Sequence, residues 1–314
     1  MKRKYFTEFA LNIYSSGPLI FRPSDIDKTE CLTDEQKEYI KNCNLYVITK
    51  RPRLTINPGS VRVQGRDVHG ELVIHLENGP QIEPFVANGY MPFDNCTAKE
   101  SKYPHHTLEA FDQHGEFFRS IPISIIAGLL TSNIQEHIDL EVIYVGQAYG
   151  AAGTRNAIDR LSSHSTLQKI LANLATDQPN YEIMLLLYPF EFHRLILNMD
   201  GRTIPQIDGP EDQAHAQHVF NARFKRNMRI SVAEAALIKY FQPKFNEIYK
   251  SNFPSNNQKI LEKVYDLDVA ALGVEINSED IGVNMFSTNR PRSEHHICKF
   301  DLHSKEQRRS FFLS

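Results

Sequence analysis

The sequence predicts an α+β fold in which helices flank a small mixed β-sheet. In the central part of the chain, short apolar runs rich in β-branched residues, typical of buried strands, alternate with helical patterns. Such an order of elements favours a sheet covered by helices. We also expect an N-terminal β-rich domain and a C-terminal extension, because a length of 314 residues favours more than one unit. The expected units span residues 1–115, 116–250 and 251–314.

The central unit is expected to contain three strands and three helices. The strands are apolar runs, whereas the helices carry apolar residues at intervals of three and four. Pro243 ends the last helix, since the residue before a proline is biased out of the helical conformation. The expected strands span 121–130, 140–146 and 181–190, and the expected helices span 155–163, 166–175 and 231–242.

The N-terminal region shows mainly β patterns. A cap formed by Thr33 and Gln36 is expected to begin a short helix. His69-Gly70 and Asn78-Gly79-Pro80 are strong turn signals. They separate expected strands at 60–64, 71–76 and 81–86. The resulting sheet is either purely structural or a module for target choice or partner binding.

The composition is typical of an ordinary soluble globular protein, with 41% hydrophobic and 23% charged residues. The formal net charge of -3 gives no overall attraction to nucleic acid, so a nucleic-acid surface must be a local patch. The apolar runs are far too short to cross a bilayer, so we expect no membrane partner. The four cysteines show no metal or disulfide spacing, which favours reduced thiols in a cytoplasmic protein.

Two stretches carry the candidate catalytic residues. The first ends a strand with Tyr144-Val145-Gly146 and continues into a helix with Arg160 and His164. These two side chains are expected about one helical turn apart. The apolar residues of the helix point elsewhere, so the arginine and the histidine would share a polar face.

The second stretch supplies a carboxylate. Glu234 precedes three large apolar residues by three, four and seven positions, namely Leu237, Ile238 and Phe241. This spacing puts the carboxylate at the centre of the helix face that should be buried. A second interpretation stays open, because Ser231 and Glu234 also match a capping box, in which the glutamate folds back onto the start of its own helix.

These pieces, in this order, resemble the GIY-YIG nuclease family. Tyr144-Val145-Gly146 is similar to the second half of the family's name. Arg160 and His164 are similar to the family's arginine and the histidine one turn beyond it. Glu234 is similar to the glutamate of the family's closing pattern. That pattern continues with an apolar pair and Pro-x-x-Asn, here Leu237-Ile238 and Gln242-Pro243-Lys244-Phe245-Asn246.

The resemblance covers roughly residues 121–246, and one part of the family pattern is missing from it. The family carries an earlier Gly-Ile-Tyr strand, whose tyrosine is thought to help activate the attacking water. The expected strand at 121–130 stands in that place and contains no tyrosine. The identity of the general base, and activity itself, therefore stay open at this point.

The resemblance implies a metal-dependent endonuclease that hydrolyses phosphodiester bonds of DNA, with RNA also a candidate substrate. Glu234 would hold Mg²⁺ or Mn²⁺, and Arg160 would clamp the scissile phosphate. Tyr144 or His164 would orient or deprotonate the attacking water. Asn246 would support the site by hydrogen bonding. A second copy of the chain, forming a homodimer, is a further candidate partner.

A basic run just ahead of the Glu234 helix is a candidate nucleic-acid surface. Its cations are Arg223, Lys225, Arg226 and Arg229. Phe224 lies among them. Clustered cations with an aromatic ring can follow phosphates and stack a base. A solvated basic face is the alternative interpretation.

Three functions stay open on the sequence alone. The first is the DNA endonuclease. The second is a catalytically degenerate nucleic-acid-binding protein on the same scaffold, which has lost activity together with the missing tyrosine. The third is an interaction protein without a nucleic-acid role, and it predicts that Arg160 and Glu234 lie far apart. The positions of residues 144, 160, 164 and 234 in space discriminate among these functions.

Overall fold

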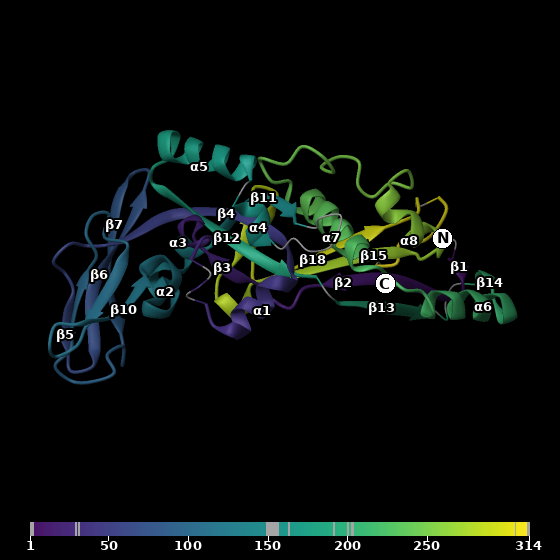
Figure 1. Cartoon of the computed structure of the whole chain (residues 1–314). Helices are drawn as coiled ribbons and strands as arrows, with labels where there is room; N and C mark the ends of the chain where they lie inside the picture. The colour runs from purple at the N-terminus through teal and green to yellow at the C-terminus, as the bar shows by residue number, and fades with distance from the viewer. Residues whose placement is uncertain are drawn as a thin grey trace.

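The structure, a computed structural model, describes residues 3–28, 30, 32–148, 157–162, 164–190, 192–199, 201, 204–304 and 306–312. Helices and strands combine in several mixed sheets, so the fold is α+β, as the sequence predicts. The molecule is elongated, with a lobe of strands and short helices at one end (Figure 1). Within these ranges no helix combines the length and the apolar character needed to cross a membrane.

The largest sheet pairs strands that lie far apart in the sequence. Its main strands are β3 (Leu19–Phe21), β4 (Cys43–Ile56), β11 (Leu140–Gln147), β12 (Tyr181–Pro189), β16 (Met285–Ser287) and β17 (Arg290–Ser293). They follow the order β17-β16-β11-β4-β12-β3. β4 lies between β11 and β12 and is antiparallel to both. The strands expected at 140–146 and 181–190 are therefore confirmed, whereas their common neighbour β4 was not expected.

Helices pack against both faces of this sheet. They are α1 (Asp34–Asn42), α4 (Ala157–Leu161), α5 (Ser165–Asp177) and α7 (Arg226–Phe241). Two further helices are α6 (Gly209–Phe220), which packs against β2 (Thr7–Tyr14) of a second sheet, and α8 (Glu262–Asp266), which follows η4 (Lys259–Leu261). Short 3-10 helices are η1 (Pro23–Asp25), η4 (Lys259–Leu261) and η5 (Glu279–Ile281). The expected cap of α1 is confirmed, because Thr33 and Gln36 form a reciprocal capping box. Thr33 therefore fixes where α1 begins.

Two buried hydrophobic clusters lie on opposite faces of the central sheet. Successive side chains of a strand point to opposite faces. Leu45 and Val47 of β4 belong to one cluster, which also contains the buried residues of α7. Tyr46 and Ile48 belong to the other, together with residues of α1, α4 and α5. Tyr46 therefore faces the layer that holds α4 and α5.

Residues 57–139 form a lobe between β4 and β11. Its elements are β5 (Arg62–Gln64), β6 (Asp67–Leu76), β7 (Gly79–Ala87), β8 (Thr97–Glu100), β9 (Thr107–Phe111), β10 (Phe117–Pro122), α2 (Ile123–Leu130), η3 (Ser132–Ile134) and α3 (Gln135–Ile138). β6 pairs with the far half of β4, so β4 runs from the central sheet into the lobe (Figure 1). The turn expected at Asn78-Gly79-Pro80 is confirmed by the β6–β7 hairpin.

The turn expected at His69-Gly70 is wrong. Gly70 lies inside β6 and pairs with Phe85 of β7. A Cβ atom at Gly70 would lie 2.7 Å from the Phe85 ring. The glycine therefore makes room for a cross-strand aromatic ring, which is one of the recurring reasons for a glycine inside a strand.

A second sheet joins the beginning, middle and end of the chain. Its strands are β2 (Thr7–Tyr14), β13 (Phe192–Met199), β15 (Ala271–Asn277) and β18 (His295–Asp301). β2 lies between β13 and β15. A short parallel pair consists of β1 (Arg3–Tyr5) and β14 (Pro205–Ile207). The boundaries expected at 115 and 250 do not separate these sheets, because strand pairing crosses both of them.

The expected strand at 121–130 is wrong. Residues 121 and 122 end β10, and α2 begins at Ile123. Ile123 and Ala127 are buried one helical turn apart, whereas Leu129 is 86% exposed. A short, uniformly apolar run gives no periodicity that would distinguish a strand from a helix. The strand that precedes β11 in the central sheet is therefore β4 and not this segment.

Candidate active site

Two tyrosines from neighbouring strands face each other at the centre of the candidate site. Tyr144 lies in β11, and Tyr46 of β4 pairs with Gly146 across the ladder. Their rings are stacked, with centroids 6.2 Å apart and an interplanar angle of 25°. A Cβ atom at Gly146 would lie 2.5 Å from the Tyr46 Oη and 2.7 Å from the Tyr144 ring. Gly146 is therefore needed for the close approach of both rings.

His164 connects this pair of rings to α5. The expectation that it shares a helix with Arg160 is wrong, because α4 ends at Leu161 and His164 is the N-cap of α5. Its Nδ1 accepts a hydrogen bond of 3.1 Å from the Leu167 N–H. The neutral ring therefore carries its proton on Nε2, which lies 3.1 Å from the Tyr46 Oη and donates to it. Burial, and then Arg160, hold the pKa of His164 below its ordinary value, so the neutral form is favoured.

Arg160 lies near the end of α4, and its side chain is exposed. Its positive charge acts on both tyrosines, on His164 and on Glu234. It also hydrogen-bonds to the Tyr46 hydroxyl. Residues 155, 156 and 163 of the expected helix lie outside the described part of the chain. Arg160 is thus positioned by α4, and its charge acts on the tyrosine pair from that helix.

Glu234 approaches the same place from α7. The capping-box interpretation is wrong, because α7 begins at Arg226 and Glu234 lies well inside the helix. The spacing argument is confirmed, since Leu237, Ile238 and Phe241 are all buried while Glu234 is half-buried. Burial raises the pKa of the Glu234 carboxyl from 4.5 to about 7, against the opposing effects of Gln147 hydrogen bonds and the Arg160 charge. A carboxyl poised near neutral pH is a common property of functional sites.

Asn246 supports the strand that carries Tyr144. The Val145 N–H donates to Asn246 Oδ1 at 2.9 Å, and Asn246 Nδ2 donates to the Val145 carbonyl at 2.8 Å. The Phe245 N–H donates to the Ile143 carbonyl at 3.0 Å. The side chain of Asn246 therefore satisfies the backbone of β11 as a neighbouring strand would. Both polar atoms of the Asn246 side chain are used to hold the strand.

Three residues near Glu234 and Tyr144 were not predicted from the sequence, namely Tyr46, Gln147 and Tyr249. Tyr46 was missed because the 57–139 lobe separates β4 from β11 in the sequence. Its signal is the apolar run Leu45-Tyr46-Val47-Ile48, which has the composition of a buried strand. Gln147 hydrogen-bonds to Glu234, and Tyr249 lies close enough for the Glu234 charge to raise its pKa in addition to burial. No local pattern marks the last two residues.

In the basic run ahead of Glu234, two cations are exposed to solvent and two bind groups of the protein. Arg223 and Lys225 are exposed. Arg226 and Arg229 are half-buried. Arg226 donates to the Asn42 carbonyl at 3.0 Å, and Arg229 donates to the Phe224 carbonyl at 2.6 Å. The expectation that Phe224 could stack a base is wrong, because its side chain is only 5% exposed.

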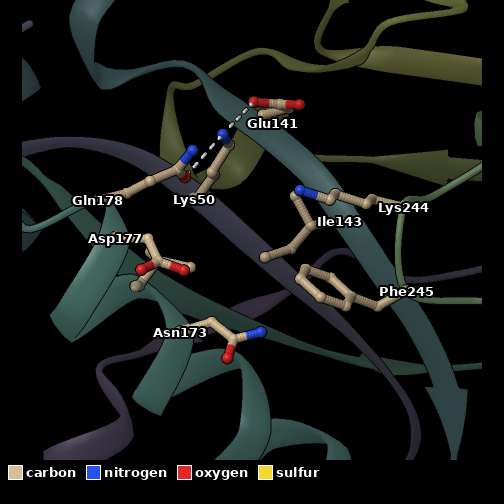
Figure 2. A pocket seen from close by; sticks show the side chains of 9 residues that line it. Lys50, Glu141, Ile143, Asn173, Asp177, Gln178, Lys244 and Phe245 are labelled. Carbon is tan, nitrogen blue, oxygen red and sulfur yellow. Dashed lines mark hydrogen bonds and ion pairs between the residues drawn. The ribbon is translucent and has the colours of Figure 1, made fainter.

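A small cavity of about 160 Å³ lies between β11, β4 and the C-terminal half of α5 (Figure 2). Lys50 lies on the wall of this cavity. Its Nζ forms an ion pair with Glu141 at 3.3 Å and donates to Gln178 at 3.4 Å. Figure 2 shows Lys244 beside Ile143 on the opposite side. Lys244 is exposed and directly precedes the segment that supports β11. It is a further cation on the wall of this cavity, and no sequence pattern marks it.

The chemistry available for a metal ion consists of one carboxylate and water. Within the described ranges, no group of three or more His, Cys, Asp or Glu residues is placed to hold a metal. Glu234 nevertheless lies close enough to Tyr144 for its charge to raise the pKa of that tyrosine, and the pKa of its own carboxyl is about 7. Mg²⁺ commonly binds through one or two carboxylates and keeps several of its waters, so this donor set fits such an ion.

One candidate site, built from two strands and three helices, therefore contains five of these residues. They are Tyr46, Tyr144, Arg160, His164 and Glu234. The interaction-protein hypothesis expects Arg160 and Glu234 to lie far apart, and the effect of the Arg160 charge on the Glu234 pKa counts against it. Comparison with known protein families, curated proteins and solved structures finds no match to this chain.

Proposed function

We propose that this protein is a metal-dependent endonuclease with a GIY-YIG-like core that hydrolyses phosphodiester bonds of DNA in the cytoplasm. The observation that carries the proposal is the convergence of two tyrosines, an arginine, a histidine and a glutamate from separate elements on one site. Hydrolysis of a phosphodiester needs an oriented water, positive charge on the phosphate and stabilisation of the leaving oxygen. The site contains residues suited to each task.

Tyr46 would take the place of the tyrosine that the family resemblance lacks at 121–130. Leu45-Tyr46 is similar to the Ile-Tyr of the family's first motif, and it lies in the strand paired with Tyr144-Val145-Gly146. Two donors, His164 Nε2–H and the Arg160 guanidinium, point at its hydroxyl. Both favour a phenolate, whereas burial raises the pKa of Tyr46 and keeps it protonated in the free protein. Tyr46 is therefore our candidate to orient the attacking water through its hydroxyl group.

His164 would act through Tyr46 and not as the base itself. Its Nδ1 accepts the Leu167 N–H, and its Nε2 already carries a proton. No ring nitrogen is left to take a proton from water. A histidine in this tautomer can donate to the Tyr46 oxygen and so fix the orientation of the Tyr46 hydroxyl. Tyr144, stacked on Tyr46, would share in orienting the water.

Glu234 and Arg160 would act on the phosphate. The guanidinium of Arg160 is exposed, permanently charged and fork-shaped, which suits it to clamp the scissile phosphate. Glu234 would hold Mg²⁺ or Mn²⁺, and the ion would supply positive charge for the leaving oxygen. Asn246 would keep β11 in place, as its bonds to Val145 indicate.

The experiment incubates purified protein with DNA, with and without Mg²⁺. We expect cleavage by the wild-type chain, and loss of at least about 100-fold in rate for Glu234→Ala, Arg160→Ala and Tyr46→Phe. Glu211→Ala is the matched control, because Glu211 is an exposed carboxylate on α6. Retained cleavage in Glu234→Ala or Arg160→Ala would refute these assignments. Replacing DNA with RNA in the same assay decides which nucleic acid is cut.

The catalytically degenerate binding protein remains the competing function. This hypothesis was based on the absence of a tyrosine from the first motif of the family pattern. Tyr46 weakens that argument, because its ring is stacked on the ring of Tyr144. It predicts salt-sensitive nucleic-acid binding without turnover under any divalent ion. Measurable cutting by clean wild-type protein, abolished in Glu234→Ala, would eliminate it.

A further inference from the structure

A cavity of about 430 Å³ lies where the central sheet meets the 57–139 lobe. Residues of the adjacent strands β4 and β12 line it, together with residues of η1, α2, α5 and the segment before β9. Cavities of about 300–1,000 Å³ are typical of sites for small molecules. Arg53, on its wall, lies seven residues beyond Tyr46 in β4, which is roughly 23 Å along a strand. The cavity is therefore separate from the tyrosine pair.

Apolar side chains provide most of the lining of this cavity, as is usual for a site that binds an organic molecule. They come from strands, from α5 and from two prolines, namely Leu54, Ile183, Leu171, Leu174, Ala175, Pro23 and Pro104. Ala175 is exposed on α5, so a molecule can reach the cavity from the side of that helix. The cavity thus offers an accessible apolar wall.

Three arginines and two carboxylates surround the polar part of the cavity. Arg22 donates to Asp25 through two hydrogen bonds of 2.7 and 2.9 Å. Arg51 donates to Glu182 at 2.8 Å, and both side chains of this pair are largely buried. The charges of Asp25 and Glu182 are therefore balanced within these two pairs.

Arg53 supplies the charge that the two pairs leave uncompensated. Its Nη2 donates to the Tyr181 carbonyl at 3.4 Å, and no ion pair joins its guanidinium to a carboxylate within the described residues. Arg53 is half-buried and permanently charged. The polar side of the cavity therefore carries a net positive charge.

His106 adds an unpartnered polar atom to the same wall. Its Nδ1 is buried and has no hydrogen-bond partner in the part of the chain that the structure describes. Such atoms are rare in folded proteins, and a water or ion that belongs to the site is one explanation for them. Burial, and then the charges of Arg22 and Arg53, hold the pKa of His106 below its ordinary value, so positive charge reaches this part of the cavity.

We propose that this cavity binds a small organic anion, with Arg53 holding the anionic group and the apolar wall holding an apolar body. A guanidinium donates two parallel hydrogen bonds to a carboxylate or a phosphate, so the two groups share this chemistry. Ser24, exposed on η1, lies on the same wall and can add a hydroxyl donor. The inference goes beyond the proposed function, because it concerns a second site with its own ligand.

The first experiment titrates the full chain with defined probes in a calorimeter, without divalent ions. 2-Naphthyl phosphate and 2-naphthoate each combine an anion with an apolar body, whereas inorganic phosphate and 2-naphthol each offer one of these parts. We expect at least one naphthyl anion to bind with a Kd below about 1 mM, and both partial probes to bind at least about 10-fold more weakly. The comparison of the two anions decides between phosphate and carboxylate. Failure of both to bind more tightly than 2-naphthol would overturn the inference.

The second experiment tests the anion contact. Arg53→Gln keeps a polar side chain and removes the charge. We expect it to weaken binding of the tighter naphthyl anion by at least about 10-fold. Arg62→Gln is the matched control, because Arg62 is exposed on β5 and lies outside this cavity. Equal affinity of Arg53→Gln and the wild-type chain would show that Arg53 does not hold the anion, and the inference would fail.

A third experiment tests the apolar wall. Ala175→Trp places an indole at the cavity without removing a charge and should abolish binding of the same anion. Ala172→Trp, also exposed on α5 but outside the cavity, should bind it as the wild-type chain does. Thermal unfolding checks that both variants are folded, and Arg53→Gln decides the question if Ala175→Trp is not. Wild-type affinity in folded Ala175→Trp would place the anion elsewhere and refute the inference.

Discussion

Gly146 is the residue whose smallness allows the two tyrosine rings to lie together. Tyr46 is 1% exposed, so its ring has no free space into which to withdraw. The atom that a larger residue would add at position 146 overlaps the Tyr46 hydroxyl and the Tyr144 ring. The glycine of the Tyr-Val-Gly sequence is thus explained by packing, independently of any family resemblance.

We predict that Gly146→Ala destabilises the protein by about 1–3 kcal/mol, the usual cost of overpacking a buried site. Denaturant unfolding measures this change. Gly201→Ala is the control, because a Cβ atom there meets nothing within 4 Å. Equal stability of Gly146→Ala and wild type would mean that the rings can move apart, and the close approach would lose its importance.

Glu234 links the site to stability through its charge. Its pKa in the folded protein, about 7, lies above the ordinary value of 4.5. The stability that depends on an uncharged Glu234 is therefore fully present below pH 4.5 and is lost as the pH rises through about 7. On the proposed function, this loss of stability is an instance of the trade between activity and stability.

We predict that Glu234→Gln increases the free energy of unfolding at pH 8 by at most about 3 kcal/mol and leaves it nearly unchanged at pH 4. The gain is an upper limit, because Glu234 is half-buried and partly screened by solvent. Chemical denaturation at both pH values measures it. A gain of equal size at pH 4 would show that charge is not the cause.

At the scale of elements, one residue, His164, contacts both the start of α5 and the tyrosine pair. His164 caps the N-terminus of α5 through Nδ1 and donates to Tyr46 through Nε2. A helix cap leaves the ring fixed in both position and tautomer. The start of a helix thus determines which atom of the histidine faces the site.

Two substitutions should separate these tasks. His164→Ala loses both contacts and should cost about 1 kcal/mol of stability, as for loss of other N-caps, together with cleavage activity. His164→Asn should recover most of the stability, because asparagine is a good N-cap, but not the cleavage. Thermal unfolding and cleavage assays on both variants measure this. Recovered cleavage in His164→Asn would remove the role of Nε2.

At the scale of the whole molecule, charge is distributed unevenly. Within the 57–139 lobe, eleven Asp and Glu residues face five Lys and Arg residues. The exposed cations Arg223, Lys225 and Lys244 lie outside this lobe, near the elements of the site. Phosphates are repelled by the acidic lobe and attracted by these cations. We expect nucleic acid to approach the central sheet and not the lobe.

The basic run can be tested by its salt dependence. Arg223→Gln and Lys225→Gln should each lower the slope of log affinity for DNA against log salt by about one, without a change in stability. Arg226→Gln should instead lower the unfolding temperature, because Arg226 donates to Asn42 within the protein. Binding isotherms at several salt concentrations measure the first effect. Unchanged slopes in Arg223→Gln and Lys225→Gln would favour a merely solvated basic face.

The sequence by itself determined those features that depend on neighbours in the chain. The cap at Thr33 and Gln36, the hairpin at Asn78-Gly79-Pro80 and the buried face of α7 around Glu234 were all predicted and are present. Each depends on side chains within a few residues of one another. Local hydrogen bonds and helical spacing act over that range, so a sequence pattern can reveal them.

Only the tertiary structure decided which strand lies beside β11. Backbone groups pair in a ladder regardless of side-chain identity, and the 57–139 lobe separates the two strands in the sequence. Tyr46, the Nε2 bond of His164 and the Gln147 contact all follow from that pairing or from the packing of α7 against it. The sequence supplied the residues of the site, and non-local pairing brought them together.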